Sequence, residues 1–330
     1  MVEAAAVRIE GKGEADVLSI GSLQVADPGP SQVLIEVEAA GLNRADILQR
    51  RGHYPAPPGV PADVPGLEYA GKVAAVGDGV SHRKVGDRVM GIVAGGGMAS
   101  HLVCHERETI AVPEGMRISD AAAIPEVYLT AYDALFVQGG LSLGQRVLLH
   151  SVGSGVGTAA LQLCKVAGAT AIGTSRSQDK LERCEKLGLH VGVLAEDKQF
   201  AKAVLEATGG AGVDLILDTV GAAYLEDNLR CLTLGGTMIV IGLMGGALGS
   251  LALGALLNKR ARIAGSVLRS RPLEEKIALA QRFERAVVPL LQNGALEPVV
   301  DRVMPMQEIA EAHRYLESNA SFGKVVMTWS

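Results

Sequence analysis

A glycine-rich run, SVGSGVG at residues 151–157, is the stretch whose residue types and spacing point most directly to chemistry. It follows the apolar run 146–150, and from Val156 onward apolar residues recur at helical spacing. A sharp strand-to-helix turn uses dihedrals that side chains disfavour, and a pyrophosphate can approach the backbone closely only where no Cβ intervenes. The helix start adds free N–H groups and a positive dipole end, so we expect a dinucleotide to bind here. The expected contacts are Gly153, Ser154, Gly155, Val156 and Gly157. The spacing is G-x-G-x-G, not the standard G-x-G-x-x-G, so the alternative is a turn that only packs a helix on a sheet.

The residues after the next strand-like run, 170–174, indicate which dinucleotide would bind. NAD-specific sites place a carboxylate about 20 residues past the glycines, where it accepts hydrogen bonds from the ribose hydroxyls. Here Ser175 and Arg176 follow the run, and Asp179 is the first carboxylate. The Arg176 guanidinium and the Lys180 ammonium suit a 2′-phosphate, which predicts NADPH. The alternative is a pair of solvated cations at the start of a helix.

The composition limits the other classes of function. The chain has 330 residues, enough for two domains, and its net charge of −5 offers no electrostatic footprint for nucleic acid. Its four cysteines form no C-x-x-C pair and no cleavable signal peptide is visible, which predicts free thiols and a cytoplasmic location. Residues 231–258 carry no charge, but seven glycines interrupt them. We therefore expect a buried strand at 237–241 and a short apolar helix there, not a membrane span.

The elements that must position these residues change character along the chain. Up to about residue 120, short β-like runs separated by glycines predict a small barrel or sandwich. From residue 146, strand-like and helix-like runs alternate, which predicts a parallel, doubly wound sheet. We expect a helical connector over 119–137 with Ser119 as its N-cap, and one long helix over 273–292.

Several separated motifs occur in one order along the chain. They are LNRAD, PGLEYAG, AAAIPEVYLTAY, SGVGTAALQL, GLMGG, LRSR and the terminal GKVV. Together they resemble the zinc-free quinone oxidoreductase (zeta-crystallin-like) branch of the medium-chain dehydrogenase/reductase superfamily. The resemblance implies an α/β fold in which a GroES-like, β-rich catalytic domain, residues 1–121 and 268–330, carries an inserted doubly wound Rossmann domain, residues 122–267. It also implies NADPH as cofactor and a homodimer. Zinc members carry Cys and His where this sequence has Asn43 and Leu67, so no metal is expected.

The same resemblance implies roles for individual residues. Asn43 could hydrogen-bond a carbonyl oxygen of the substrate, and Tyr54 could stack on its ring or donate a proton. The alternatives are a turn-capping asparagine and a packed loop aromatic. Thr130 resembles the residue beside the nicotinamide; alternatively its hydroxyl bonds its own helix backbone. Lys324 is a candidate phosphate contact, or else a solvated lysine before an edge strand. Further cofactor contacts are expected from Lys180, Gly242, Leu243 and Met244.

The expected activity is NADPH-dependent reduction of a small-molecule quinone or related electrophile without a metal. The cofactor supplies the hydride, and the protein supplies proximity and a dry site. Two alternatives stay open: an NADPH-dependent enone or alkenal double-bond reductase, and a crystallin-like protein that binds NADPH without turnover. The uncharged segment 247–257 is the candidate interface of a homodimer.

Overall fold

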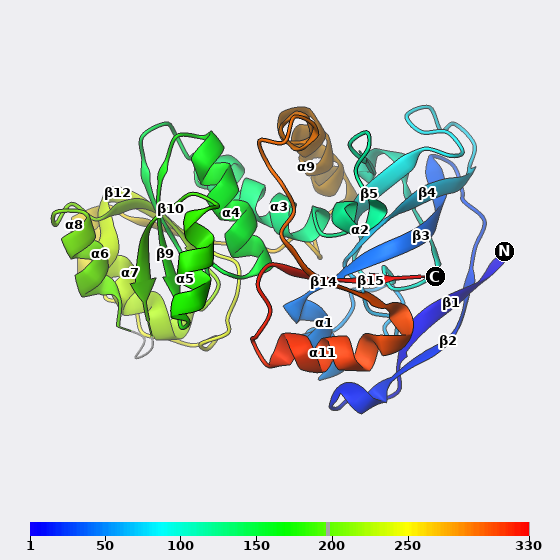
Figure 1. Ribbon diagram of the computed structural model, residues 1–330, viewed down its shortest axis with the longest axis horizontal. Helices are drawn as coiled ribbons and strands as arrows, with labels where there is room; N and C mark the ends of the chain where they lie inside the picture. The colour runs from blue at the N-terminus through cyan, green and yellow to red at the C-terminus, as the bar shows by residue number, and fades with distance from the viewer. Residues whose placement is uncertain (196–198, 330) are drawn as a thin grey trace. The chain divides into compact units, whose positions relative to one another are not determined.

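The computed structural model describes residues 1–195 and 199–329 (Figure 1). They form two compact units: Met1–Leu129 with Leu268–Ser330, and Thr130–Val267. Each unit has its own sheet, so each is described by itself.

The boundary between the units differs from the expected one, which fell after residue 121. Residues 122–129 lie with the first unit. There the backbone N–H of Glu126 donates to Glu68 Oε2, and the Tyr128 hydroxyl donates to the backbone oxygen of Glu297, each at 2.8 Å. The second boundary falls after Val267.

The first unit is built on a seven-stranded sheet in the order β14-β15-β3-β4-β5-β7, with β6 also paired to β3. The strands are β3 (Gln32–Leu42), β4 (Glu68–Val76), β5 (Arg88–Ile92), β6 (His101–His105), β7 (Ile110–Ala111), β14 (Val300–Pro305) and β15 (Lys324–Thr328). A separate antiparallel hairpin is formed by β1 (Val2–Ile9) and β2 (Leu18–Val25). This β-rich unit matches the predicted catalytic domain in character.

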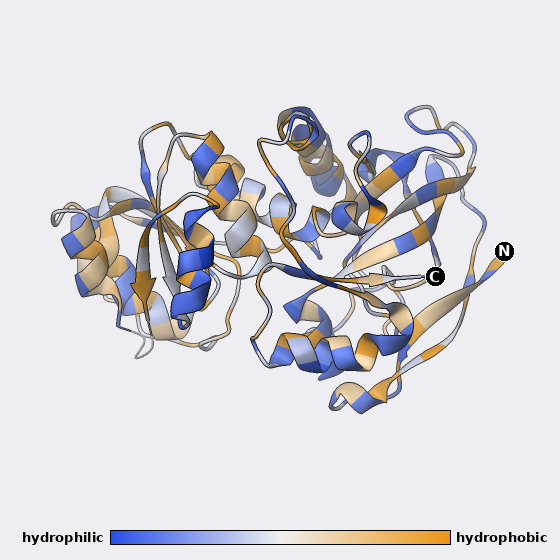
Figure 2. Ribbon diagram, in the orientation of Figure 1, coloured by the Kyte–Doolittle hydropathy of each residue, from blue (hydrophilic) through white to orange (hydrophobic). Residues whose placement is uncertain are grey.

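The end of the chain returns to this sheet. Strand β15 pairs antiparallel with β3, so that Val325 lies opposite Leu42. Figure 1 shows the red C-terminal strand beside the blue β3. The helix α11 (Ile309–Glu317) has alternating blue and orange bands in Figure 2, and its buried residues are Ile309, Ala312 and His313. An amphipathic helix of this kind covers a core with its apolar face.

Two expected helices are interrupted, each near a proline. The connector 119–137 consists of α2 (Ile118–Ala121), α3 (Pro125–Tyr132) and a π-helical turn, Asp133–Gln138, and the N-cap of α2 is Arg117, so the prediction of Ser119 was wrong. Proline disfavours helical dihedrals at the preceding residue and lacks an N–H, which explains the break before Pro125. Likewise 273–292 divides into α9 (Leu273–Ala286) and α10 (Val288–Gln292), with Pro289 in the first turn of the second.

The second unit contains the predicted doubly wound sheet. Its six strands are all parallel, in the order β10-β9-β8-β11-β12-β13. They are β8 (Arg146–Leu149), β9 (Thr170–Ser175), β10 (Leu189–Leu194), β11 (Val213–Asp218), β12 (Leu232–Val240) and β13 (Arg262–Gly265). The helices between them are α4 (Gly155–Val166), α5 (Gln178–Glu185), α6 (Ala201–Ala207), α7 (Leu225–Cys231) and α8 (Leu253–Lys259). One of the alternating helix-like runs expected from the sequence, 197–207, begins among residues 196–198, which lie outside the described residues.

Candidate active site

The glycine run forms the turn between β8 and α4. Ser154 is the N-cap of α4, and its hydroxyl oxygen accepts a hydrogen bond from the backbone N–H of Gly157 at 3.1 Å. A Cβ on Gly157 would lie 2.4 Å from the backbone oxygen of Val152 and 2.6 Å from that of Ser151. Glycine is therefore required here for close packing of the helix start against the strand end. This geometry fits a pyrophosphate at the helix N-terminus.

The turn after β9 holds the candidate contacts to the 2′-phosphate. Ser175 is buried, and its hydroxyl oxygen accepts from the backbone N–H of Ser177 at 3.1 Å. Arg176 is exposed and Lys180 is half-buried in the first turn of α5. The first carboxylate, Asp179, lies 3.8 Å from Arg183 on the same helix. The turn thus carries two cations, Arg176 and Lys180. Its nearest carboxylate, Asp179, pairs with Arg183 one turn further along α5.

The loop after β12 is fastened to the loop after β11. The backbone N–H of Gly245 donates to the backbone oxygen of Val220 at 2.7 Å, and a Cβ on Gly242 would lie 2.7 Å from the backbone oxygen of Thr219. Leu243 and Met244 are each 56% exposed. This loop, the glycine turn and the turn after β9 all lie beyond the carboxyl ends of parallel strands. Ligands of open α/β sheets bind at that edge.

Thr130 lies within α3 and is half-buried. Its hydroxyl makes no hydrogen bond to the residues that the structure describes, so the expected alternative, a bond to its own helix, is not formed. The predicted place beside the nicotinamide stays a prediction.

Lys324 is placed differently from the prediction. It is 4% exposed, and its ammonium donates to Glu68 Oε1 at 2.6 Å, Asn43 Oδ1 at 2.7 Å and the backbone oxygen of Leu42 at 2.9 Å. An ammonium has three donors, and these bonds use all three. The prediction that Lys324 contacts a cofactor phosphate was therefore wrong, because the pairing of β15 with β3 buries the side chain against Glu68.

Asn43 belongs to the same buried network. It is the N-cap of α1 (Arg44–Arg50), and its backbone N–H donates to Asp46 Oδ2 at 2.8 Å. Its side-chain amide donates to Glu68 Oε1 at 2.8 Å and to the backbone oxygen of Gly41 at 3.2 Å. Both amide donors are occupied, so a bond to a substrate carbonyl would require one of these to break. The geometry fits the capping alternative better than the catalytic prediction.

Two carboxyl groups near this network have raised pKa values, and neither was among the predicted site residues. Asp46 is fully buried; desolvation raises its pKa to about 6, although backbone N–H groups of Asn43 and Gly66 donate to it. Glu126 is half-buried, and desolvation followed by the charge of Glu68 raises its pKa to about 8. The Glu126 carboxyl has no hydrogen-bond partner within the described part of the chain. A carboxyl group with a pKa of about 8 carries its proton at neutral pH.

Tyr54 is held by Arg269, which sequence analysis placed only within the LRSR motif. Arg269 is 6% exposed, and its guanidinium carbon lies 4.8 Å from the centroid of the Tyr54 ring. It donates to the backbone oxygens of Tyr54 at 3.0 Å and Ala94 at 2.6 Å, and to Gln49 Oε1 at 2.6 Å. Desolvation, then the nearby Glu126, raises the pKa of Tyr54. Its hydroxyl makes no hydrogen bond to a described residue, so the hydroxyl remains available to a ligand.

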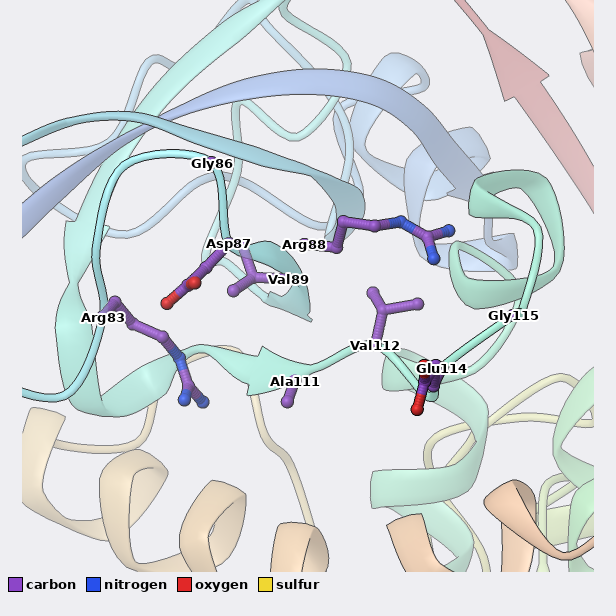
Figure 3. Close-up of a pocket in the computed structure, with 9 residues that line it drawn as sticks. All are labelled: Arg83, Gly86, Asp87, Arg88, Val89, Ala111, Val112, Glu114 and Gly115. Carbon is purple, nitrogen blue, oxygen red and sulfur yellow. The ribbon is translucent and has the colours of Figure 1, made fainter.

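A hollow of about 420 Å³ lies elsewhere in the first unit (Figure 3). Its two arginines are already engaged, Arg83 with Thr109 and Glu284, and Arg88 with the backbone oxygen of Met116. It has none of the predicted site residues, and we assign it no role.

Two further observations concern metals and membranes. Among the described residues, no group of three or more His, Cys, Asp or Glu side chains could hold a metal ion. Within the same residues, no helix is long and apolar enough to cross a membrane.

The relationship of the chain to known proteins follows from comparison. Residues 29–114 match the alcohol dehydrogenase GroES-like domain, and residues 155–285 match the zinc-binding dehydrogenase family. Rat quinone oxidoreductase is 30% identical over 327 residues, which span 98% of this chain and 97% of that protein. The chain belongs to the medium-chain dehydrogenase/reductase superfamily.

Other members of the superfamily are comparably similar. The rat synaptic vesicle membrane protein VAT-1 homolog is 32% identical over 317 residues, covering 91% of this chain and 77% of the relative. The crystal structure of JamJ enoyl reductase superposes with a TM-score of 0.89 at 26% identity and covers 100% of both chains. The predicted fold, a GroES-like domain with a Rossmann-like parallel sheet, is confirmed. The protein is accordingly a nicotinamide-dependent oxidoreductase of this superfamily.

Proposed function

We propose that the protein is an NADPH-dependent quinone oxidoreductase that works without a metal. The observation that carries the choice of NADPH is the turn after β9, where Arg176 is exposed and the first carboxylate is Asp179. The glycine turn at 153–157 would hold the pyrophosphate, and Arg176 with Lys180 the 2′-phosphate. When bound, the cofactor supplies a hydride.

The absence of a metal is proposed from the surroundings of Asn43. By the resemblance, Asn43 stands where zinc members carry their first ligand. The buried Lys324 ammonium lies 2.7 Å from its side-chain oxygen. A positive charge already occupies this position, and it would repel a divalent cation.

The acceptor is proposed to lie against Tyr54. Arg269 fixes both the ring and the backbone of Tyr54, so the ring offers a rigid apolar face for a planar quinone. A quinone accepts the hydride as an electrophile, and the hydroquinone oxygens take their protons from water. Tyr54 therefore binds the acceptor, and reduction of a quinone does not require it to act as an acid.

The test follows NADPH oxidation at 340 nm with a benzoquinone and, separately, with an alkenal. Faster turnover of the quinone supports the proposal. Faster turnover of the alkenal would favour the double-bond reductase. The likeness to an enoyl reductase and the raised pKa of Glu126 are both consistent with that alternative. An enone needs a proton on carbon as well as a hydride, and an acid of pKa about 8 could supply it. NADPH binding without turnover of either acceptor would show a non-catalytic protein.

We also propose that the protein is a homodimer and that the second copy covers the segment 247–257. Leu248, Leu253 and Leu257 in and beside α8 are 93%, 64% and 75% exposed. The neighbouring β13 is an end strand of its sheet. Apolar side chains next to an unpaired strand edge suit a partner with the same surface. Light scattering should give twice the chain mass, and replacing Leu253 and Leu257 by Glu should give the monomer.

A further inference from the structure

A chain of side-chain hydrogen bonds lies beneath the carboxyl ends of the strands in the second unit. His150, directly after β8, is fully buried. Its Nδ1 lies 2.8 Å from the hydroxyl of Thr174 in β9, and its Nε2 lies 2.6 Å from Oδ1 of Asn228 in α7. Asn228 Nδ2 in turn donates to Asp218 Oδ2, at the end of β11, at 3.2 Å.

The chemistry of the four groups gives this chain one direction. Because the Asn228 amide nitrogen donates to a carboxylate, its oxygen must be the acceptor, so His150 Nε2 carries the proton. His150 Nδ1 then accepts from the Thr174 hydroxyl. Burial lowers the pKa of His150 to about 4, which keeps the ring neutral at physiological pH. The hydrogen bonds run from Thr174 through His150 and Asn228 to Asp218.

The surroundings exclude water from this chain. Thr174 and Asp218 are each 1% exposed and Asn228 is 0% exposed. The rings of Phe200 and Tyr224 both pack with their centroids 4.8 Å from that of His150. Among the described residues, the charged and titratable groups that face these hydrogen bonds are Asp218 itself, the Tyr224 hydroxyl and, at longer range, Arg176. Burying these polar side chains costs desolvation free energy that apolar side chains of the same size would not cost. We therefore expect their hydrogen bonds to serve a function.

Each end of the chain is joined to a different cofactor loop. Thr174 precedes the turn that carries Arg176, and His150 precedes the glycine turn. At the other end, Asp218 Oδ1 accepts from the backbone N–H groups of Val220 at 2.7 Å and Gly221 at 3.1 Å. Val220 holds the 242–246 loop through its bond from Gly245. One network of hydrogen bonds therefore reaches the glycine turn, the turn that carries Arg176 and the 242–246 loop, which are the three predicted sites of cofactor contact in the second unit.

We propose that Thr174, His150, Asn228 and Asp218 are positioning residues that set the spacing of the cofactor loops. The Thr174 end fixes the turn that reads the 2′-phosphate, and the Asn228–Asp218 end fixes the 242–246 loop, whose residues Gly242, Leu243 and Met244 are predicted cofactor contacts. This inference rests on the proposed binding of NADPH at these loops. It predicts that the two ends affect different properties of the cofactor site.

The first test replaces the hydroxyl at one end. Thr174→Val keeps the shape but removes the donor to His150. The dissociation constant for NADPH should rise roughly 3- to 10-fold, the effect of one hydrogen bond, while that for NADH stays within about twofold. Thr174→Ser, which retains the hydroxyl, should keep the wild-type preference for NADPH over NADH. The matched control is Thr237→Val, the same change at a 7% exposed position in β12, which should leave the ratio of the two constants unchanged.

The second test uses Asn228→Asp, which places a second carboxylate against Asp218. The Asn228 amide nitrogen lies 3.2 Å from Asp218 Oδ2, and two carboxylates this close share one proton. This proton can replace the lost amide donor. Binding of NADP⁺, measured by calorimetry, should be weakened at pH 8 and should approach the wild-type value at pH 6. Thr174→Val should not show this recovery.

The outcomes separate the inference from the proposed function. Wild-type protein that binds neither NADPH nor NADH would overturn both. Wild-type protein that binds NADPH, with Thr174→Val no different from Thr237→Val and no recovery of Asn228→Asp at pH 6, would overturn the inference alone. A change in melting temperature without a change in the NADPH to NADH ratio or in the pH profile would show a purely structural core.

Discussion

Removal of the Lys324 ammonium should be among the most destabilising single changes in the first unit. Lys324→Met removes the ammonium that lies 2.6 Å from the Glu68 carboxylate, which is 0% exposed and has no other ion-pair partner among the described residues. Breaking a buried pair in this way typically costs about 3–5 kcal/mol. Glu68 keeps hydrogen bonds from Asn43 and from the Glu126 backbone, so we expect the lower end, ~3 kcal/mol. Denaturant unfolding at pH 7 measures it as a fall in the free energy of unfolding.

Two further variants decide whether this reasoning is correct. Lys72→Met removes an ion pair of similar length, 2.9 Å to Glu38, but with side chains 50% and 36% exposed, and should cost less than about 1 kcal/mol. Adding Glu68→Gln to Lys324→Met removes the unpaired charge and should recover part of the loss. If Lys324→Met cost no more free energy of unfolding than Lys72→Met, the buried-pair account would be refuted. If Lys324→Met raised KM for NADPH but not for NADH, the predicted contact of Lys324 with a cofactor phosphate would be supported instead.

Three other perturbations test separate parts of the structure. Gly157→Ala should lower the melting temperature strongly because its Cβ would lie 2.4 Å from the backbone oxygen of Val152. The control is Gly254→Ala, whose Cβ would have no atom within 4 Å, and which should leave the melting temperature unchanged or higher. Equal shifts would contradict the packing argument. In steady-state kinetics, Tyr54→Phe should keep substantial quinone turnover and Tyr54→Ala should mainly raise KM, so an inactive Phe variant would make Tyr54 an essential acid. Glu126 has a pKa of about 8 in the folded protein against 4.5 as its ordinary value, so between these values the folded state binds more protons and its stability falls as pH rises. Glu126→Gln should therefore gain stability relative to wild type between pH 5 and pH 8, and a constant difference would show that the carboxyl is already ionised.

The sequence was most informative where its signals are local. Periodicity and the glycine run predicted β8, the turn and α4, and the alternation after residue 146 predicted a parallel sheet. The sequence pattern predicted one continuous helix in each of two places where a proline, Pro125 or Pro289, lies close to a break between two helices. It also set the start of β12 at residue 237 instead of Leu232, because a shift in register lets Leu232 pair with Val213.

The candidate site was harder to predict because most of its partners are distant in the chain. Lys324 and Glu68 are 256 residues apart, and Arg269 and Gln49 are 220 apart. Only the pairing of β15 with β3 brings the first pair together, and spacing along the chain gives no sign of it. The same holds for Glu126, whose raised pKa depends on burial and on Glu68. The LRSR and IPE motifs contained Arg269 and Glu126, yet gave no indication of what these residues contact.

The central claim is tested most directly by kcat/KM for NADPH and NADH with a benzoquinone, in the wild type and in the Arg176→Ala, Lys180→Ala double variant. The wild type should prefer NADPH. Loss of the charge-assisted contacts to the 2′-phosphate costs about 1.5–3 kcal/mol, so the variant should lose roughly one to two decades of that preference through KM for NADPH alone. Equal kcat/KM for the two cofactors in the wild type would contradict the account, because Arg176 and Lys180 would then not be reading a 2′-phosphate.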